Sequence, residues 1–321
     1  MTEKILSRRD FLRAAALSTG AAVLGPGNLS VLANPPAQSA SITYLDVDES
    51  GAGDEAYAVY QQLAEMFMDS HPDIEVRFQP ALEGWSDALV TDMVAGVAAD
   101  IFPHYAGFGR PLMENGQTLA LDDYFSAEDL ADFYEEQILA VELEGRLYGL
   151  PKYLSSIAIA YNKGMLDEAG VTYPGEDLDW ETFFAAVSQA AQLGPNESGA
   201  RFGYNVNLGY SNHWVWQNGG EWMNAPVLGT KILINEPPAL EALQRLYDLV
   251  FVEHSAPTVQ DIEGLGWPQV FQTGRFAFVE GHSWQVNEWV RTIDFDWDYA
   301  TLPAGSAGRI GTVFNDSYSI W

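Results

Sequence analysis

Apolar positions along the chain follow two alternating periods, one typical of strands and one typical of helices. Residues 42–47 and 74–78 have the apolar or alternating patterns of strands. Between them, apolar residues recur at helical spacing over 56–68, and a second helical pattern covers 85–99. This regular alternation predicts an α/β fold with mainly parallel sheets that are covered on both faces.

Local signals predict where later elements begin. Residues 154–161 form an apolar run typical of a buried strand. Ser126 and Asp129 have the spacing of a capping box, which predicts the start of a helix. Asp179 is expected to cap a helix over 180–193, and a proline pair at 237–238 is expected in the first turn of another.

Composition narrows the possible functions. The 321 residues include no cysteine, which excludes disulfides, thiolate zinc sites and cysteine nucleophiles. Fifteen basic side chains stand against 45 acidic ones, giving a net charge of -30. Phosphates and anionic lipids would be repelled, so no nucleic acid partner is expected. The acidic surface fits both a high-salt habitat and an ordinary exported binding protein, and the sequence does not decide between them.

The first 33 residues are typical of an export signal. Residues 7–13 (SRRDFLR) resemble the twin-arginine motif, and the eleven small or apolar residues that follow are too few to span a bilayer. Small residues at Val31 and Ala33 offer a cleavage site. We therefore expect residues 1–33 to be a twin-arginine signal peptide. The mature protein is expected to be periplasmic or extracellular, without a lipid anchor because it has no cysteine.

Two segments resemble enzyme motifs, but each lacks residues or surroundings that the motif requires. Residues 281–285 (GHSWQ) resemble a nucleophile elbow but lack its second glycine, and no histidine follows His282. Acidic side chains surround residues 51–53 (GAG), where a pyrophosphate would have to bind. The five histidines show no metal-ligand spacing. We therefore expect no catalytic residue, metal or cofactor, although paired carboxylates of a glycosidase remain possible among so many acids.

Aromatic and polar residues cluster in segments that follow strands or open helices. Because ligands of open α/β sheets bind beyond the carboxyl ends of the strands, these segments are candidate ligand sites. Indole faces suit the C–H faces of sugars, while carboxylates and amides suit their hydroxyls. The candidates chosen on this basis are Trp85, Asp87, His104, Tyr105, Trp214, Trp216, Glu221, Trp222, His282 and Trp284. For any one tryptophan, burial in the core is an equally good interpretation.

From residue 42 onward, the order of segments resembles the sugar-binding extracellular solute-binding proteins of ABC importers, relatives of the maltodextrin-binding protein. The matching segments are 67–78 (FMDSHPDIEVRF), 145–151 (GRLYGLP), 159–170 (IAYNKGMLDEAG), 180–183 (WETF), 216–221 (WQNGGE), 271–284 (FQTGRFAFVEGHSW) and 296–303 (DWDYATLP). The resemblance implies a two-lobed periplasmic-binding-protein fold of type II, whose lobes close on a ligand and are joined by crossing strands.

The resemblance also implies lobe boundaries and further site residues. The first lobe would comprise residues 34–153 and 282–313, and the second lobe 154–281 and 314–321. Crossings are expected near 153–157, near 279–281 and near Asn315. Family members run about a hundred residues further, so the second lobe is expected to be incomplete. The loops facing the ligand would add Asp48, Glu49, Tyr153 and Asn315 to the candidates.

The function expected from these observations is capture of a mono- or oligosaccharide by a monomer that delivers it to the permease subunits of an ABC importer. A receptor for another polar solute, such as a polyol or a polyamine attracted by negative charge, is the first alternative. An extracellular glycosidase is the second. It would require two carboxylates roughly 5–10 Å apart at the site, with the pKa of one of them raised.

Overall fold

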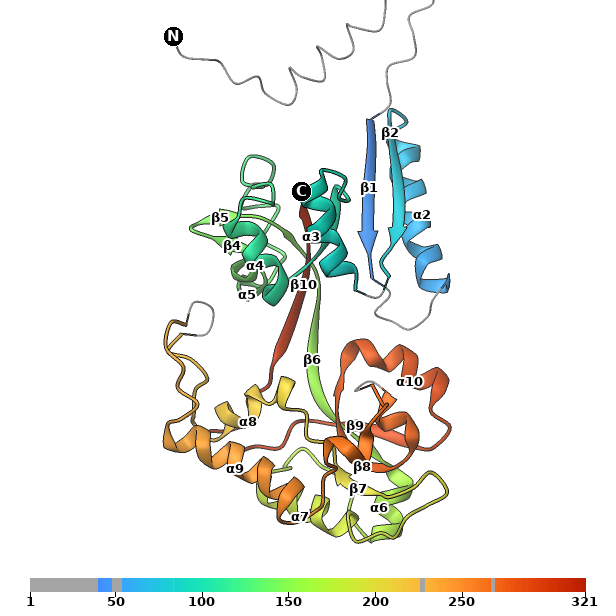
Figure 1. The fold of residues 1–321 in the computed structure, drawn as a ribbon, viewed down its shortest axis with the longest axis vertical. Coiled ribbons are helices and arrows are strands. Elements are labelled where there is room, and N and C mark those ends of the chain that lie inside the picture. The colour runs from blue at the N-terminus through green and yellow to red at the C-terminus, as the bar shows by residue number, and fades with distance from the viewer. Residues whose placement is uncertain (1–39, 48–53, 83, 226–228, 267–268) are drawn as a thin grey trace, which may run out of the picture. The chain divides into compact units, whose positions relative to one another are not determined.

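The computed structural model describes residues 40–47, 54–82, 84–225, 229–266 and 269–321 (Figure 1). The expected signal peptide, residues 1–33, and the candidates Asp48 and Glu49 lie outside the described residues. No helix in the described part of the chain is long and apolar enough to cross a bilayer.

The first strands and helices alternate as their hydrophobic periods predict. β1 (Ala40–Asp46) pairs in parallel with β2 (Ile74–Pro80) along its full length. A parallel pair needs a crossover connection, and α2 (Asp54–Ser70) lies in it. α3 (Trp85–Ala95) then leads to β3 (Ile101–Tyr105), which pairs in parallel with β1 on the side opposite β2.

The segment after β3 corrects one prediction. Its elements are α4 (Ala106–Glu114), α5 (Glu135–Ala140), β4 (Glu142–Leu143) and β5 (Arg146–Leu147). The capping box does form, because the Ser126 hydroxyl donates to the Asp129 carboxylate at 2.7 Å and the Asp129 amide donates back at 3.3 Å. Turns follow it and not the expected helix. A capping box bonds only the backbone amides of the first helical turn. A short helix also needs an apolar face that it can bury against the rest of the protein.

One long strand is shared by two parts of the sheet. β6 (Leu150–Asn162) pairs with β10 (Val313–Ile320) through its first half, up to Ser156. From Ile157 onward it pairs instead with β8 (Phe276–His282) and β9 (Trp297–Ala300). The strand order is β2-β1-β3-β10-β6-β8-β7, with β9 also on β6. We call residues 40–156 with 313–321 the first lobe, and residues 157–312 the second lobe.

Helices and short turns complete the second lobe. They are α6 (Lys163–Ala169), α7 (Trp180–Ala190), α8 (Asn212–Gln217), α9 (Pro237–Phe251) and α10 (Val286–Thr292), with the short strand β7 (Phe202–Tyr204) and the 3-10 turns η1 (Leu208–Tyr210), η2 (Val259–Ile262), η4 (Phe271–Thr273) and η5 (Ser283–Gln285). Asp179 caps α7 by accepting the Thr182 amide at 2.8 Å, and Pro237 opens α9, which confirms both local predictions.

Of the three predicted crossings, the one near 279–281 is absent, and the one near Asn315 runs from the second lobe to the first and not in the predicted direction. The partner change of β6 falls within 153–157, where the first crossing was expected. No crossing occurs at 279–281, because β8 stays paired with β6 and β7 and the next helix, α10, buries Trp289 against Phe271 of the second lobe. The sequence also assigns residues 314–321 to the second lobe, but β10 pairs with β3. Local patterns identify a strand without identifying a partner that lies 200 residues away.

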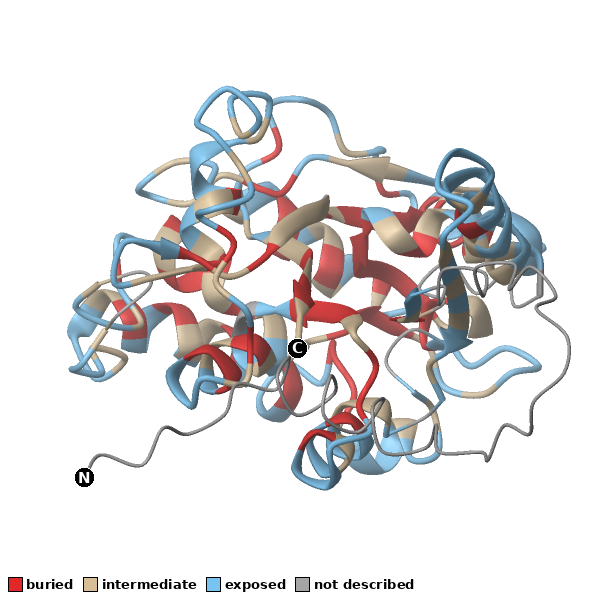
Figure 2. Cartoon of the chain, turned by 90° about the horizontal axis from the view of Figure 1, so that it is seen from above, coloured by how far each residue is buried: buried red, intermediate tan, exposed pale blue. Residues whose placement is uncertain are grey.

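Each lobe has its own apolar core. In the first lobe, Leu45, Leu89 and Phe102 form a buried cluster against which Trp321 packs. In the second lobe, the aromatic residues Phe183 and Phe278 are fully buried. Seen from above, buried residues concentrate on the strands, and exposed ones lie on the outer faces of the helices (Figure 2). The loops that follow the strands are therefore held on a rigid framework.

Candidate functional site

A pocket in the second lobe is lined by three of the aromatic and acidic candidates. Its volume is about 590 Å³. The lining residues come from α8, from the loop that follows it and from the segment before β10: Asn212, Trp216, Gly219, Gly220, Glu221, Trp222, Met223, Ala225, Ala307 and Ile310. Because α8 follows the carboxyl end of β7, the pocket lies where ligands of α/β sheets bind.

Two glycines shape the loop that carries Glu221 and Trp222. Gly219 has a left-handed backbone with φ of 76°, which glycine adopts without strain. A Cβ on Gly220 would lie 2.7 Å from the backbone nitrogen of Ala239, so only glycine allows the loop to approach α9 this closely. Trp222 then packs against the buried cluster of Val215 and Ala239, which fixes its indole at the pocket wall.

The chemistry of this lining suits a neutral, hydroxylated ligand. Trp216 and Trp222 offer apolar faces, Asn212 offers an amide and Glu221 offers a carboxylate. No basic side chain is among the lining residues, so an anionic ligand would find no counter-charge there. Apolar walls with a few polar groups that fix orientation are typical of small-molecule sites.

Two predicted aromatic residues of the first lobe also come together. Trp85, at the start of α3, and Tyr105, at the end of β3, have ring centroids 6.1 Å apart. Phe108 packs against both, at 5.4 Å from Trp85 and 5.7 Å from Tyr105. Tyr105 is 40% exposed and Asp87 is exposed in the first turn of α3, so this end of the first lobe keeps accessible aromatic and acidic groups.

Tyr153 lies beside a buried ion pair that sequence reasoning missed. Lys152 Nζ donates to Asp46 Oδ1 at 2.7 Å, and the Asp46 side chain is fully buried. The hydroxyls of Tyr44 and Tyr318 both donate to the other carboxylate oxygen, Oδ2. Burial, and the negative charge of Asp46, raise the pKa of both tyrosines. The only sequence signal was the position of Asp46 at a strand end, because its partners are distant in the chain.

Trp214 and two histidines are core residues, which corrects the prediction that they face a ligand. Trp214 is 1% exposed, and its indole donates to the buried Glu280 carboxylate at 3.0 Å. His104 is 1% exposed, bonds Ser319 Oγ at 2.6 Å and packs directly against Gly109. His282 is equally buried. Buried positions exclude contact with a ligand in this conformation.

Burial has the same electrostatic effect on three histidines. We call His104, His213 and His282 the three buried histidines. Desolvation disfavours the charged ring and lowers the pKa of each to about 4. The three rings are therefore neutral at physiological pH. Separately, the described residues contain no group of His, Asp or Glu arranged to hold a metal ion.

The two remaining candidates lie near the strands shared by the lobes. Trp284 is half-buried and its ring lies 5.7 Å from that of His282. The Asn315 side chain exchanges hydrogen bonds with α5: its Nδ2 donates to the Gln137 carbonyl at 3.2 Å, and its Oδ1 accepts from Gln137 Nε2 at 3.1 Å. Asn315 thus ties β10 to the first lobe, and its amide is already engaged.

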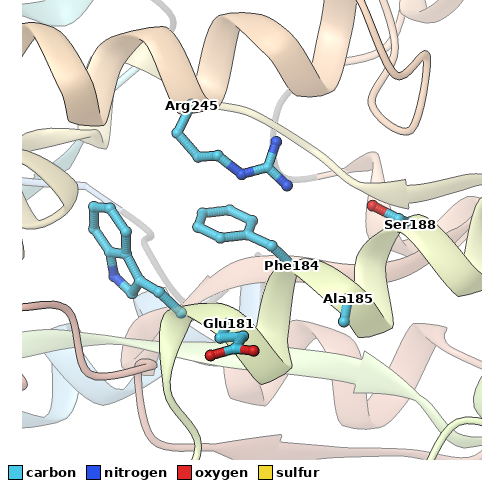
Figure 3. Close-up of a pocket in the computed structure, with 6 residues that line it drawn as sticks. Glu181, Phe184, Ala185, Ser188 and Arg245 are labelled. Carbon is cyan, nitrogen blue, oxygen red and sulfur yellow. The ribbon is translucent and has the colours of Figure 1, made fainter.

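A second pocket in the second lobe, of about 440 Å³, lies between α7 and α9 (Figure 3). The guanidinium of Arg245 lies over the ring of Phe184, 4.3 Å from its centroid. Arg245 is also paired with Glu253, which accepts the Ser188 hydroxyl at 2.9 Å. Because Arg245 and Ser188 are both engaged by Glu253, they are less available to a ligand in this pocket.

The shared strands, the separate cores and the pocket at a strand end define a two-lobed α/β solute-binding protein. Residues 51–319 match the family model of the bacterial extracellular solute-binding proteins, and the chain belongs to that family. This finding confirms the resemblance stated from the sequence. It also identifies the family as one of extracellular binding proteins.

Similarity to individual proteins supports the same assignment. A putative binding protein of Brucella abortus (strain 2308) is 25% identical over 294 residues, which cover 88% of this chain and 68% of that protein. The maltotriose-binding protein of Pyrococcus abyssi is 23% identical over 247 residues, 76% of this chain and 50% of that one. The ABC substrate-binding protein Lmo0181 from Listeria monocytogenes, solved in complex with cycloalternan, has a TM-score of 0.74, at 24% identity and coverage of 88% and 71%. The type II two-lobed fold is thereby confirmed.

Proposed function

We propose that this protein captures a carbohydrate outside the cytoplasm and delivers it to the permease subunits of an ABC importer. The observation that carries the proposal is the pocket beside α8, where two indoles, one amide and one carboxylate meet without a basic group. A maltotriose-binding protein and a protein solved with cycloalternan are among the similar proteins, and both ligands are oligosaccharides.

In the proposed mechanism, the ligand shifts a population between an open and a closed form. The sugar first stacks on Trp216 and Trp222 of the second lobe. Aromatic groups of the first lobe, such as Trp85, Tyr105 and Tyr153, then contact its other face. Because the closed form gains contacts from both lobes, the ligand stabilises it, and the permease would recognise that form. No bond is made or broken in this cycle, and the protein acts as a monomer.

A thermal-shift screen tests the proposal. Neutral mono- and oligosaccharides, polyols and polyamines are added separately to the purified protein, and the unfolding midpoint is recorded. A ligand at 100 times its Kd stabilises the native state by about 2.7 kcal/mol, so a cognate sugar should raise the midpoint. A response to polyamines and not to sugars would favour the alternative receptor, and release of sugar fragments on incubation would favour a glycosidase.

Under the glycosidase alternative, Glu280 is a candidate general acid, because burial raises its pKa to about 7. A general acid of a glycosidase needs such a pKa, but it must also reach the sugar and face a second carboxylate. Glu280 is 2% exposed and bonds Tyr204 and Trp214, and it does not line the pocket beside α8. These contacts support a structural role for Glu280 over a catalytic one.

The export route is part of the proposal. Arg8 and Arg9 would direct the precursor to twin-arginine export, and the mature chain would be released without an anchor. Changing both arginines to lysine should leave the precursor in the cytoplasm, as measured by fractionation and immunoblotting. Normal export of that double variant would show that another route is used.

A further inference from the structure

Glu221 is the only charged side chain among the described residues that line the pocket beside α8. It is exposed, and in the described part of the chain no basic side chain forms an ion pair with it. A second carboxylate lies close to the same loop, because Asn218, at the end of α8, donates from Nδ2 to Glu241 Oε2 at 3.3 Å. Glu221 therefore gives the pocket a negative charge that a ligand can reach.

Two basic residues are close to this pocket along the chain, and neither lines it. Arg309 lies in the segment before β10, but its guanidinium donates to the backbone carbonyl of Leu302 at 2.7 Å and to that of Glu176 at 2.6 Å. Lys231 lies on the returning side of the loop that carries Glu221, and it is exposed. A cation that pairs with Glu221 would therefore come from the ligand.

The two indoles of the pocket are also suited to a cation. Trp216 and Trp222 are both half-buried and line the same pocket as Glu221. The face of an aromatic ring is negative, and tryptophan attracts cations more strongly than the other aromatic residues do. Two indoles beside a carboxylate therefore suit an ammonium group better than a hydroxyl group, because the hydroxyl has no net charge.

We propose that the pocket beside α8 prefers sugars that carry a protonated amino group. This inference rests on the proposed function and narrows its class of ligand. The ammonium group would pair with Glu221, the C–H face of the ring would stack on Trp216 or Trp222, and the Asn212 amide would bond a hydroxyl. A neutral sugar can stack and can bond Glu221 in the same way, but it gains neither the charge-assisted hydrogen bond nor the attraction to the indole face.

The size of the preference follows from the exposure of Glu221. At accessible positions, an ion pair and a cation–π contact each change a Kd by about 2- to 5-fold. Together they should make an amino sugar bind about 4- to 25-fold more tightly than the neutral sugar of the same shape. A sugar acid should bind more weakly than the neutral sugar, because its carboxylate would approach Glu221 without a counter-charge.

Matched pairs of sugars test the preference by calorimetric titration. The pairs are glucose with glucosamine, galactose with galactosamine, and the trimer of glucosamine with its uncharged N-acetylated form. At about pH 6.5 the amines are largely protonated, and at about 0.15 M salt the field of distant charges is screened beyond about 8 Å. The charged member should bind more tightly in each pair that binds. Equal or weaker binding of the charged members would overturn the inference.

Two glutamine variants locate the charge that is responsible. Glu221→Gln keeps a side chain that forms hydrogen bonds but removes the charge, so the ratio of affinities within a pair should fall by about 2- to 5-fold, whatever happens to either affinity. Glu197→Gln removes the same charge from an exposed residue of the second lobe that does not line the pocket, and it should keep the wild-type ratio. An unchanged ratio in Glu221→Gln, or an equal fall in both variants, would overturn the assignment to this pocket.

The same titrations separate this inference from the proposed function. Neutral and charged sugars that bind equally well would overturn the preference and would still support carbohydrate capture. Failure of every sugar to bind, charged or neutral, would contradict the proposed function and the preference with it. Spermidine, a polyamine without a sugar ring, is the last probe. If it binds more tightly than every amino sugar, the site recognises charge alone, and the inference is overturned.

Discussion

Trp214 and Trp216 are two residues apart, yet their replacement by alanine should have opposite consequences. Neighbours two apart on a helix point about 200° away from each other around its axis. Trp214 is 1% exposed and packs against Phe183 and Phe184, with ring centroids 5.6 and 5.4 Å away. Trp216 is half-buried and lines the pocket. Trp214 is therefore expected to contribute to the stability of the fold, and Trp216 to ligand binding.

The magnitudes follow from burial. A buried aromatic side chain covers about 150–250 Å², which at about 25 cal/mol per Å² corresponds to about 4–6 kcal/mol. Core Trp→Ala changes cost about 3–5 kcal/mol, so Trp214→Ala should lower the free energy of unfolding by about 4 kcal/mol. Trp216→Ala should cost only about 1 kcal/mol of stability. It should cost about 1–3 kcal/mol of sugar binding, a loss of about 5- to 150-fold in affinity.

Urea unfolding followed by circular dichroism measures the first quantity, and calorimetric titration with the sugar that gives the largest thermal shift measures the second. Tyr247→Ala is the control, since Tyr247 is an exposed aromatic residue of α9 in the same lobe that does not line the pocket. It should change neither quantity by more than about 0.5 kcal/mol. The reasoning is refuted if Trp216→Ala binds the sugar as tightly as the wild type, or if Trp214→Ala is as stable as Trp216→Ala.

Three further predictions concern stability. Gly220→Ala should destabilise the protein by about 1–3 kcal/mol, because the new Cβ would clash with the backbone of α9. Gly194→Ala is the control and should be nearly neutral, because no atom lies within 4 Å of its new Cβ. Equal urea midpoints for the two variants would contradict this. Lys152→Met should lower the free energy of unfolding by about 3–5 kcal/mol, because it leaves Asp46 buried without its cation. Adding Asp46→Asn should restore part of that stability, and a double-mutant cycle measures the effect. The three buried histidines, with folded pKa values lowered to about 4, should make stability fall as the pH falls from 6.5 to 5, because the unfolded chain then binds three more protons. Glu280, with its pKa raised to about 7, opposes this by one proton, so the free energy of unfolding should fall by about 3 kcal/mol in total between pH 6.5 and pH 5; a flat profile over that range would refute the assignment.

Features set by neighbouring residues could be predicted from the sequence. The helical spacing over 56–68 became α2, and Asp179 caps α7, because both depend on contacts within a few residues. Trp216 and Trp222 were chosen because they flank a flexible glycine turn, a signal that is also local, and both line the pocket beside α8. The resemblance of seven segments in order supplied the two-lobed fold, which no single segment could have indicated.

Features set by distant residues could not be predicted in this way. The pairing of β10 with β3 joins segments 200 residues apart, and the ion pair of Lys152 with Asp46 joins residues 106 positions apart. His104 looked like a binding residue because it follows a strand, but its burial depends on the packing of Gly109 and on Ser319. Residues 212–217 form a short α-helix, and helical geometry places Trp214 and Trp216 on different sides of it.

The central claim is that a carbohydrate binds at the pocket beside α8. Hydrogen exchange read by mass spectrometry, with and without a saturating oligosaccharide, locates the ligand without any substitution. The account predicts slower exchange in peptides covering residues 212–225, with a second protected region in the first lobe around Trp85 and Tyr105. Protection confined to other parts of the chain, or exchange unchanged by any carbohydrate, would contradict it.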